Sequence, residues 1–264
     1  MLPGIHLVGA PLIASTISVG EHPTVQVGPL TIDIDTVWAT VIAGMLVVLL
    51  GFLMVRKATS GVPGKFQLCW EMLVEAVQRQ VDESIGPRGA KVVPLALTLF
   101  IFIFTCNLFE VIGIGARYEV LPAPTSDINL PLAMALYAIA LVHQAAIRNR
   151  GVGGYVKHYV TRPFEPKALY PVNAFMNVID ELVRPLTLTL RLFGNLLAGG
   201  LMLSLLAALV VWKLGPIPLG GLLTVPLTVI WKLFDMAIGA IQAFIFALLV
   251  IVYFETAMAP DSAH

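Results

Sequence analysis

Five long apolar stretches are spaced along the chain, and each is long enough to form a membrane helix. A helix that crosses about 30 Å of hydrocarbon needs about 20 predominantly apolar residues. The stretches cover residues 37–55, 92–114, 130–147, about 171–214 and about 219–254. The pattern therefore predicts an all-α polytopic membrane protein with about five membrane-crossing helices. We expect residues 1–264 to form one integral membrane domain.

The pattern changes between residues 63 and 85, where apolar residues recur every three or four positions. Charged and amide side chains fill the positions between them. This spacing is typical of an amphipathic helix. Its apolar face can rest on the membrane surface or pack against a helix of a partner, and the sequence leaves both alternatives open. The apolar positions are Phe66, Trp70, Leu73, Val74, Val77, Val81 and Ile85.

Composition supports the membrane as the solvent of this chain. Apolar residues make up 58% of it and charged residues only 12%, whereas soluble domains are about 25% charged. The 16 basic and 16 acidic residues cancel, so no basic surface predicts a nucleic-acid partner. Cys69 and Cys106 fit neither a disulfide framework nor a metal-binding spacing.

Lys and Arg in the loops predict which side of the membrane each loop occupies. The first 55 residues contain none, six fall in the loop at 56–91, one in the loop at 115–129 and five at 148–167. The amino terminus is therefore predicted to be outside. Five crossings then leave the helix at 63–85 and the carboxyl terminus cytoplasmic. Residues 1–36 lack the basic start of a signal peptide, so we interpret them as a retained external segment.

The stretch at 171–214 is too long for one perpendicular crossing. As a helix its 44 residues would run about 66 Å, twice the thickness of the hydrocarbon. It must tilt, lie flat or fold back, so we expect residues 171–254 to form a hairpin of two long tilted helices. A polar stripe follows one helical face and points toward a wet cavity or another protein. The stripe comprises Asn173, Asn177, Asp180, Arg184, Thr187, Arg191, Asn195 and Ala198.

The two arginines of this stripe differ in their neighbours. Arg184 follows Glu181 by three positions and Asp180 by four, which predicts a local ion pair, structural or at a channel mouth. Arg191 has no acidic residue three or four positions away on either side. An arginine at this depth costs at least about 2.5 kcal/mol, so its partner is expected on another helix or another subunit. The alternative is that Arg191 extends to the membrane interface.

The last apolar stretch carries a second polar stripe. Lys232, Asp235, Gly239, Gln242 and Phe246 share one helical face. Lys232 and Asp235 are three positions apart, so they either neutralise each other or act separately. Two polar stripes within hydrocarbon are typical of a proton or ion path.

Two motifs lie in the last two apolar stretches. Residues 190–199 read Leu-Arg-Leu-Phe-Gly-Asn-Leu-Leu-Ala-Gly, and residues 242–246 read Gln-Ala-Phe-Ile-Phe, followed by Val-Tyr at 252–253. They resemble the signature and the last helix of a known family, subunit a of the membrane sector of the rotary F-type ATP synthase. Residues 107–110, 124–129 and 171–173 give further matches in the same order. The matches cover about residues 92–253, and the sequence is most similar to mycobacterial and related actinobacterial forms.

The resemblance implies that Arg191 is the family's essential arginine, facing the carboxylate of each passing c subunit. It also implies two offset half channels beside the rotor-facing hairpin at 171–254. The candidates for the proton path are Asn195, Asp235, Gln242 and Glu110. The chain would take no part in ATP chemistry itself, and neither a cofactor nor a metal is expected. The implied partners are the c-subunit rotor ring, a b-type subunit of the peripheral stalk, the whole F1F0 complex and the lipid bilayer, in the cell membrane.

One departure from the family concerns its titratable groups. Many members have an acidic residue at the position of Gly200 and a histidine at that of Asp235. In this chain the acidic residue has changed helices, so we hypothesise that the two positions face each other across one cavity.

Two other classes of protein would also place charged residues in membrane helices. A secondary ion-coupled transporter is the main alternative, but such transporters tend to contain internal repeats, and we find none. An intramembrane enzyme would need a catalytic motif such as HExxH or GxSxG, and neither occurs. His143 has no companion nearby in the sequence, so we expect a structural role for it.

Overall fold

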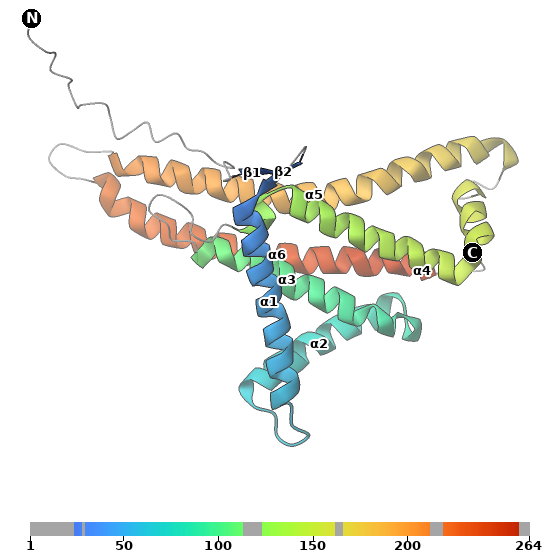
Figure 1. Ribbon diagram of the computed structural model, residues 1–264, viewed down its shortest axis with the longest axis horizontal. Coiled ribbons are helices and arrows are strands. Elements are labelled where there is room, and N and C mark those ends of the chain that lie inside the picture. Colours follow the sequence, from blue (N-terminus) through green and yellow to red (C-terminus); the bar gives the residue numbers. More distant parts are fainter. Residues whose placement is uncertain (1–23, 28–29, 113–122, 162–165, 212–218, 259–264) are drawn as a thin grey trace, which may run out of the picture.

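The computed structural model describes residues 24–27, 30–112, 123–161, 166–211 and 219–258 (Figure 1). These residues form six long α-helices, four short 3-10 turns and one β-hairpin. The α-helices are α1 (Ile34–Lys57), α2 (Lys65–Ser84), α3 (Val93–Ile112), α4 (Asn129–Thr161), α5 (Tyr170–Ala208) and α6 (Leu219–Met258). The turns are η1 (Pro87–Lys91), η2 (Pro124–Ser126), η3 (Lys167–Leu169) and η4 (Leu209–Val211). The predicted all-α class is confirmed.

A short hairpin precedes the first helix and was not predicted. Strands β1 (Thr24–Val27) and β2 (Leu30–Asp33) pair antiparallel, with Val25 opposite Ile32. The hairpin falls within the segment at 1–36 that we expected only to be external. Residues 1–23 of that segment lie outside the described residues.

The described residues contain four helices that are long and apolar enough to cross a membrane. They are α1, α4, α5 and α6, and α3 contributes a shorter apolar helix, Val93–Phe109. Together they correspond to the five predicted stretches. The sequence therefore folds as a multi-pass membrane protein.

Helices α5 and α6 are inclined steeply to α1 (Figure 1). At 39 and 40 residues they are each about 60 Å long, so a perpendicular crossing would leave half of each helix outside the hydrocarbon. Each also contains an internal proline, Pro185 and Pro226, which removes one helical hydrogen bond. Their length and inclination agree with the long tilted pair that we expected, and α5 and α6 pack against each other.

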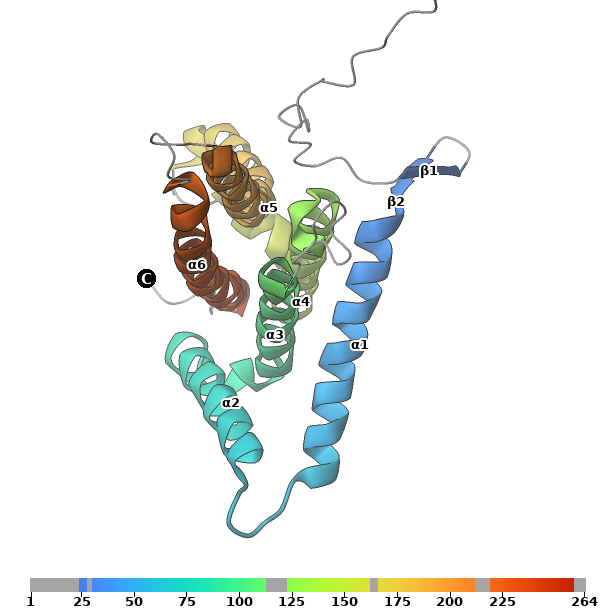
Figure 2. The ribbon, with the colours of Figure 1, turned by 90° about the vertical axis from the view of Figure 1, so that its left-hand side faces the viewer.

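The core lies where α3, α4 and α5 meet α6. Helix α1 stands apart from α6, with α3 and α4 between them (Figure 2), and it packs on α3. Burial of large apolar side chains at these contacts removes their surface from lipid and fills the interior densely. The core side chains with the least exposure include Ile103, Leu188, Leu192, Phe246 and Val250.

Helix α4 is broken at Gly151, whose φ of 71° and ψ of 164° are not helical. A positive φ suits glycine because it has no Cβ to clash with the backbone. The predicted third stretch ended at residue 147, close to this break, while the helical segment at 152–161 was not predicted. The break lets that segment turn away from the axis of the first part (Figure 1). On the same side, Asn149 and Arg150 donate hydrogen bonds to the carbonyls of Met258 and Thr256 at the end of α6.

Helix α2 occupies the place predicted for the amphipathic helix. Its second half packs on the bundle through Val77, Val81 and Ile85, which join the main core. Phe66 and Met72 in its first half stay exposed. Part of the apolar face is therefore covered by this chain itself, and the rest is available to lipid or to a partner.

Candidate functional site

Arg191 lies on α5 between the side of the helix that packs on the core and the side that is exposed. Leu188 and Leu192 beside it are almost completely buried, while Arg191 itself is half-buried. Of the described residues, no carboxylate lies within ion-pair distance of its guanidinium. The structure thus agrees with the prediction that Arg191 has no acidic partner on its own helix, and within the described residues it has none on a neighbouring helix either.

Arg184, about two turns earlier on α5, has the local partner that the spacing predicted. Its Nη1 lies 3.5 Å from Oε2 of Glu181. Its guanidinium also lies over the Tyr253 ring of α6, at 5.1 Å from the ring centroid. Asp180 is exposed and forms part of the wall of a nearby pocket.

The polar stripe of α6 faces the interior. Asp235 is 6% exposed, and the Gln242 Oε1 atom is buried without a hydrogen-bond partner among the described residues. The Lys232 Nζ atom donates to the Val111 carbonyl at 3.2 Å. A buried amide oxygen that lacks a protein partner needs water or another polar group, which makes Gln242 the strongest indication of a wet site on this helix.

Asn107 of α3 joins this interior polar face, a role that its place in the motif at 107–110 did not predict. Its Nδ2 donates to the Gly239 carbonyl at 3.0 Å, and its Oδ1 accepts from the Thr125 hydroxyl at 3.0 Å. A Cβ added at Gly239 would lie 3.0 Å from the Asn107 Cβ. Gly239 therefore permits the close approach of α3 and α6. Glu110 lies one turn further along α3, and its side chain is outside the described residues.

The stripe on α5 divides into two parts with different roles. Asn173 and Asn177 donate to the carbonyls of Val160 and Tyr159, and so hold the second segment of α4 against α5. Asn195, one turn beyond Arg191, is half-buried, whereas Thr187 and Ala198 are exposed. The side chains of Asn173 and Asn177 are thus engaged in packing α4 on α5.

His143 has contacts that its neighbours in the sequence did not predict, and the structural role that we expected for it stays a prediction. Its Nε2 lies 2.7 Å from the Glu181 Oε1, and its Nδ1 lies 3.0 Å from the Tyr155 hydroxyl. The Tyr159 hydroxyl donates to the other oxygen of Glu181. Glu181 comes 38 positions after His143, and the Gly151 break brings the tyrosines to it. We call these four residues, with Arg184, the His143–Glu181 cluster.

This cluster borders a pocket of about 430 Å³ between α4, α5 and the end of α6. Arg150, His158, Asn177 and Asp180 line the remaining polar part of its wall, with Thr256 from α6. Charges of both signs and several hydrogen-bonding groups therefore surround a space that is large enough for several waters.

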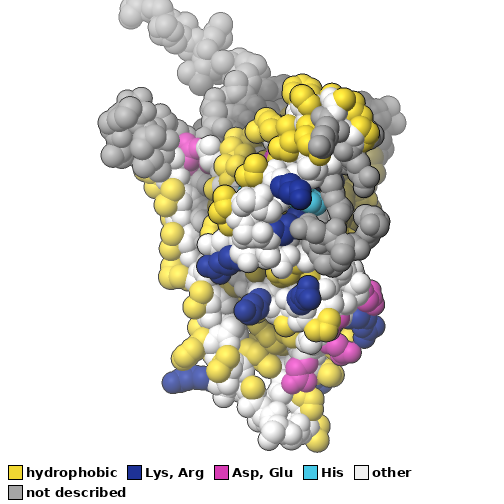
Figure 3. Space-filling view, turned by 90° about the vertical axis from the view of Figure 1, so that its right-hand side faces the viewer, with side chains coloured by type: hydrophobic (Ala, Val, Ile, Leu, Met, Phe, Trp, Pro, Cys, Tyr) yellow, Lys and Arg dark blue, Asp and Glu magenta, His cyan; other side chains and the backbone are white. Residues whose placement is uncertain are grey.

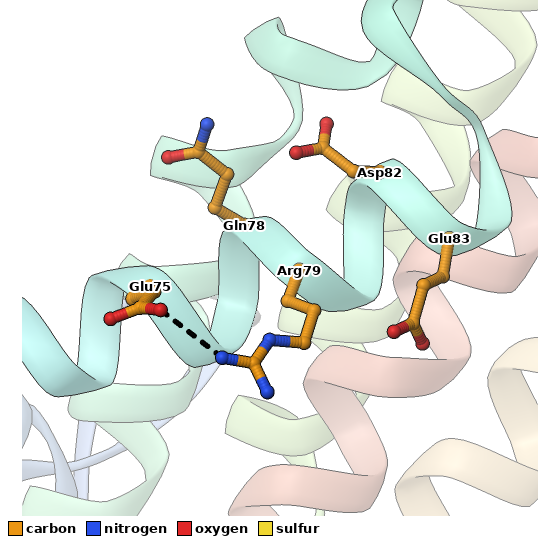
Figure 4. Close-up of a pocket in the computed structure, with 5 residues that line it drawn as sticks. All are labelled: Glu75, Gln78, Arg79, Asp82 and Glu83. Atoms are coloured by element: carbon orange, nitrogen blue, oxygen red, sulfur yellow. Dashed lines mark hydrogen bonds and ion pairs between the residues drawn. The ribbon is translucent and has the colours of Figure 1, made fainter.

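A second hollow lies on the outer face of α2 (Figure 4). Its lining residues all come from this one helix, and Arg79 pairs with Glu75 at 3.1 Å. Exposed pairs of this kind contribute little to stability. We interpret the hollow as a solvated helix face. Within the part of the chain that the structure describes, no group of three or more His, Cys, Asp or Glu side chains is arranged to hold a metal ion.

The geometry defines a polytopic membrane protein with titratable and charged groups inside its helix bundle. Comparison with known proteins makes the class specific, because residues 37–255 match the family described as ATP synthase A chain. The chain belongs to this family. Membership in this family argues against the alternative of a secondary transporter.

Three relatives illustrate how closely the chain follows the family. It is 46% identical to the ATP synthase subunit a of Acidothermus cellulolyticus, over 94% of this chain and 85% of that protein. It is 38% identical to the subunit a of Mycobacterium bovis, over 96% of this chain and 98% of the relative. The ATP synthase subunit a 1 of Photobacterium profundum is 35% identical, over 86% and 87%. The expected likeness to mycobacterial and related forms is confirmed.

Proposed function

We propose that the chain is the stationary subunit of the proton channel of an F1F0 ATP synthase, and that Arg191 is its essential arginine. The observation that carries this proposal is a half-buried guanidinium on an apolar helix, with no ion-pair partner among the described carboxylates. A carboxylate presented by a rotor subunit would complete the pair. Because guanidinium remains charged, it favours the ionised form of that carboxylate and does not carry the proton itself.

Two offset half channels would bring protons to and from this position. Asp235 and Gln242 lie on one part of α6, and Arg184 contacts Tyr253 near the other end. Asp235 and Tyr253 are 18 positions apart, or about 27 Å along the helix. This separation supports one route through Asn195, Asp235, Gln242 and Glu110 and a second route beside Arg184. Lys232 would lie at the mouth of the first route, and Asp180 and Glu181 at that of the second.

The partners and the orientation follow from the exposed surfaces. Leu186, Leu190 and Leu197 beside Arg191 are exposed, which suits contact with the apolar helices of a c-subunit ring. The exposed first half of α2 suits a b-type stalk subunit. Lys and Arg gather on the face seen in Figure 3, the side on which α4 and α6 end and α5 begins in Figure 1. The positive-inside rule then favours a cytoplasmic carboxyl terminus and an external amino terminus in the cell membrane.

The test is replacement of Arg191 within the assembled enzyme. Arg191→Ala is expected to insert normally and to abolish proton-driven ATP synthesis in inverted vesicles. Arg191→Lys should also fail, because an ammonium lacks the planar, delocalised guanidinium and loses its charge more readily on desolvation. Arg79→Ala on the outer face of α2 is the matched control and should retain synthesis. Near-normal coupling in Arg191→Ala would show that the assignment is wrong.

A further inference from the structure

The His143–Glu181 cluster joins two membrane helices through titratable groups that the proposed function has not used. His143 comes from α4 and Glu181 from α5, and their side chains are 29% and 20% exposed. Both oxygens of Glu181 have contacts within the cluster, one with His143 and the other with Tyr159 and Arg184. A carboxylate with this many partners is held in one place beside the pocket.

The geometry lets His143 take up a proton without moving. In the neutral ring, Nε2–H donates to Glu181 while Nδ1 accepts from the Tyr155 hydroxyl, which fits the 2.7 and 3.0 Å contacts. In the protonated ring, both nitrogens donate, so Nδ1–H donates to the Tyr155 oxygen and the hydroxyl turns outward. One heavy-atom arrangement therefore accommodates both charge states.

Arg184 adds a fixed positive charge to the cluster. Its guanidinium contacts Glu181 and the Tyr253 ring, and it lies between Glu181 and Arg191 along α5. Glu181 and Arg191 are ten positions apart, or about 15 Å. A proton leaving the rotor near Arg191 would need water over this distance, and the pocket of about 430 Å³ beside Glu181 provides room for it.

We infer that His143 and Glu181 together form the proton-exchange site of the half channel on the Arg184 side. This inference rests on the proposed function. A proton arriving through water binds to Nδ1 of neutral His143, as the Tyr155 hydroxyl turns outward, or to Oε1 of ionised Glu181, and it then leaves to water in the pocket. No other bond changes. Tyr155 and Tyr159 position the pair, and Arg184 favours the ionised carboxylate so that the proton is released again.

Other charged and titratable groups face the same pocket and must be considered in any pH dependence. From α4 these are Arg150, Tyr155, His158 and Tyr159, and from α5 they are Asp180 and Arg184. Tyr253 of α6 does not line the pocket but contacts Arg184. Asp180 is exposed at the pocket, whereas Glu181 is held by the cluster. Glu83, exposed on α2 away from this pocket, gives a control variant with the same change of charge.

The experiment measures passive proton conductance in inverted vesicles stripped of F1 but retaining the complete membrane sector. The pH is varied from about 5 to 8, the range in which histidine changes charge, separately in the medium and in the vesicle lumen. In these vesicles the medium bathes the side that we propose to be cytoplasmic. A positioned acid or base accelerates a proton transfer about 100-fold or more. When the group is removed, water in the pocket should still transfer protons, so the expected loss of conductance is smaller than this factor.

Glu181→Gln should lower the conductance at least about tenfold and flatten its dependence on medium pH, while its dependence on lumenal pH is unchanged. His143→Gln should displace the medium-pH profile, and Glu181→Asp should restore most of the conductance. Glu83→Gln, on the outer face of α2, is the matched control and should behave as the parent. Uniform loss of conductance at every pH, on both sides, would mean that the pair only joins α4 to α5. A Glu83→Gln profile like that of Glu181→Gln would also overturn the exchange site.

The test separates this inference from the proposed function. If Arg191→Ala abolishes coupling while Glu181→Gln keeps the normal medium-pH profile, the proposed function stands and the exchange site is wrong. If Arg191→Ala retains coupling, the proposed function itself fails. Recovery of the sector by detergent extraction, equal for all variants, excludes loss of assembly as the cause. If Glu181→Gln fails to assemble, His143→Gln decides the question, and an unaltered medium-pH profile in that variant would also overturn the exchange site.

Discussion

The contact between Gly239 and Asn107 allows a quantitative test of how α3 and α6 are joined. In Gly239→Ala, the new methyl would lie 3.0 Å from the Asn107 Cβ and 3.3 Å from its Nδ2. The helices must then separate slightly, which stretches the 3.0 Å hydrogen bond from Asn107 to the Gly239 carbonyl. Overpacking of this kind costs about 1 to 3 kcal/mol.

A cysteine next to this contact reports on its opening. Cys106 precedes Asn107 and is fully buried, and Cys69 is exposed, so a Cys69→Ser background leaves one protected thiol. Local opening exposes such a thiol to a maleimide at a rate set by the opening free energy. A loss of about 1 to 3 kcal/mol corresponds to labelling that is about 5- to 150-fold faster.

Gly51→Ala in α1 is the matched control, because nothing lies within 4 Å of the position of its new Cβ. Both substitutions replace a helical glycine with alanine and gain similar helix propensity, about 1 kcal/mol. Only Gly239→Ala meets a packed neighbour. Equal labelling rates for the two variants would refute the argument that Gly239 is required for the approach of α3 and α6.

Two further predictions concern the channel route and the exposed half of α2. Asp235→Asn should slow ATP-driven proton pumping markedly in a dye-quenching assay. Adding Lys232→Met to this variant should not restore pumping, whereas adding Gly200→Glu should restore it in part. Rescue by Lys232→Met alone would mean that Asp235 only neutralises the lysine. Phe66→Glu should reduce co-purification of the stalk subunit about tenfold or more, since burial of a large apolar side chain contributes about 1.5 to 3 kcal/mol. Unchanged recovery of the stalk subunit would favour contact of the first half of α2 with the membrane surface. Val77→Glu should instead reduce extraction of the whole sector, because Val77 packs on the core.

The helices could be predicted from the sequence because apolar length is a local property. The boundaries of α1 and α6 lie within a few residues of the predicted stretches, since basic residues or glycine and proline mark their ends. The same locality made the Arg184–Glu181 pair predictable, because three positions on one helix always bring two side chains together.

Features that depend on tertiary structure could not be predicted in this way. The contact of His143 with Glu181 requires α4 and α5 to pack, and its contact with Tyr155 requires the positive φ at Gly151. Gly151 stands among several glycines, so nothing in the sequence distinguishes it as the break. Asn107 became recognisable as a link between helices only when α6 was seen to pass beside it.

The inclination of α5 has a mechanical consequence under the proposed function. A helix of 39 residues is about 60 Å long, and a helix with its side chains is about 10 Å across. Lying obliquely against a ring of upright hairpins, α5 would touch several neighbouring hairpins at once. Each subunit would then begin its contact before the previous one has finished. We therefore expect the stator to hold the ring continuously during rotation, with sliding between apolar surfaces in place of repeated detachment and docking.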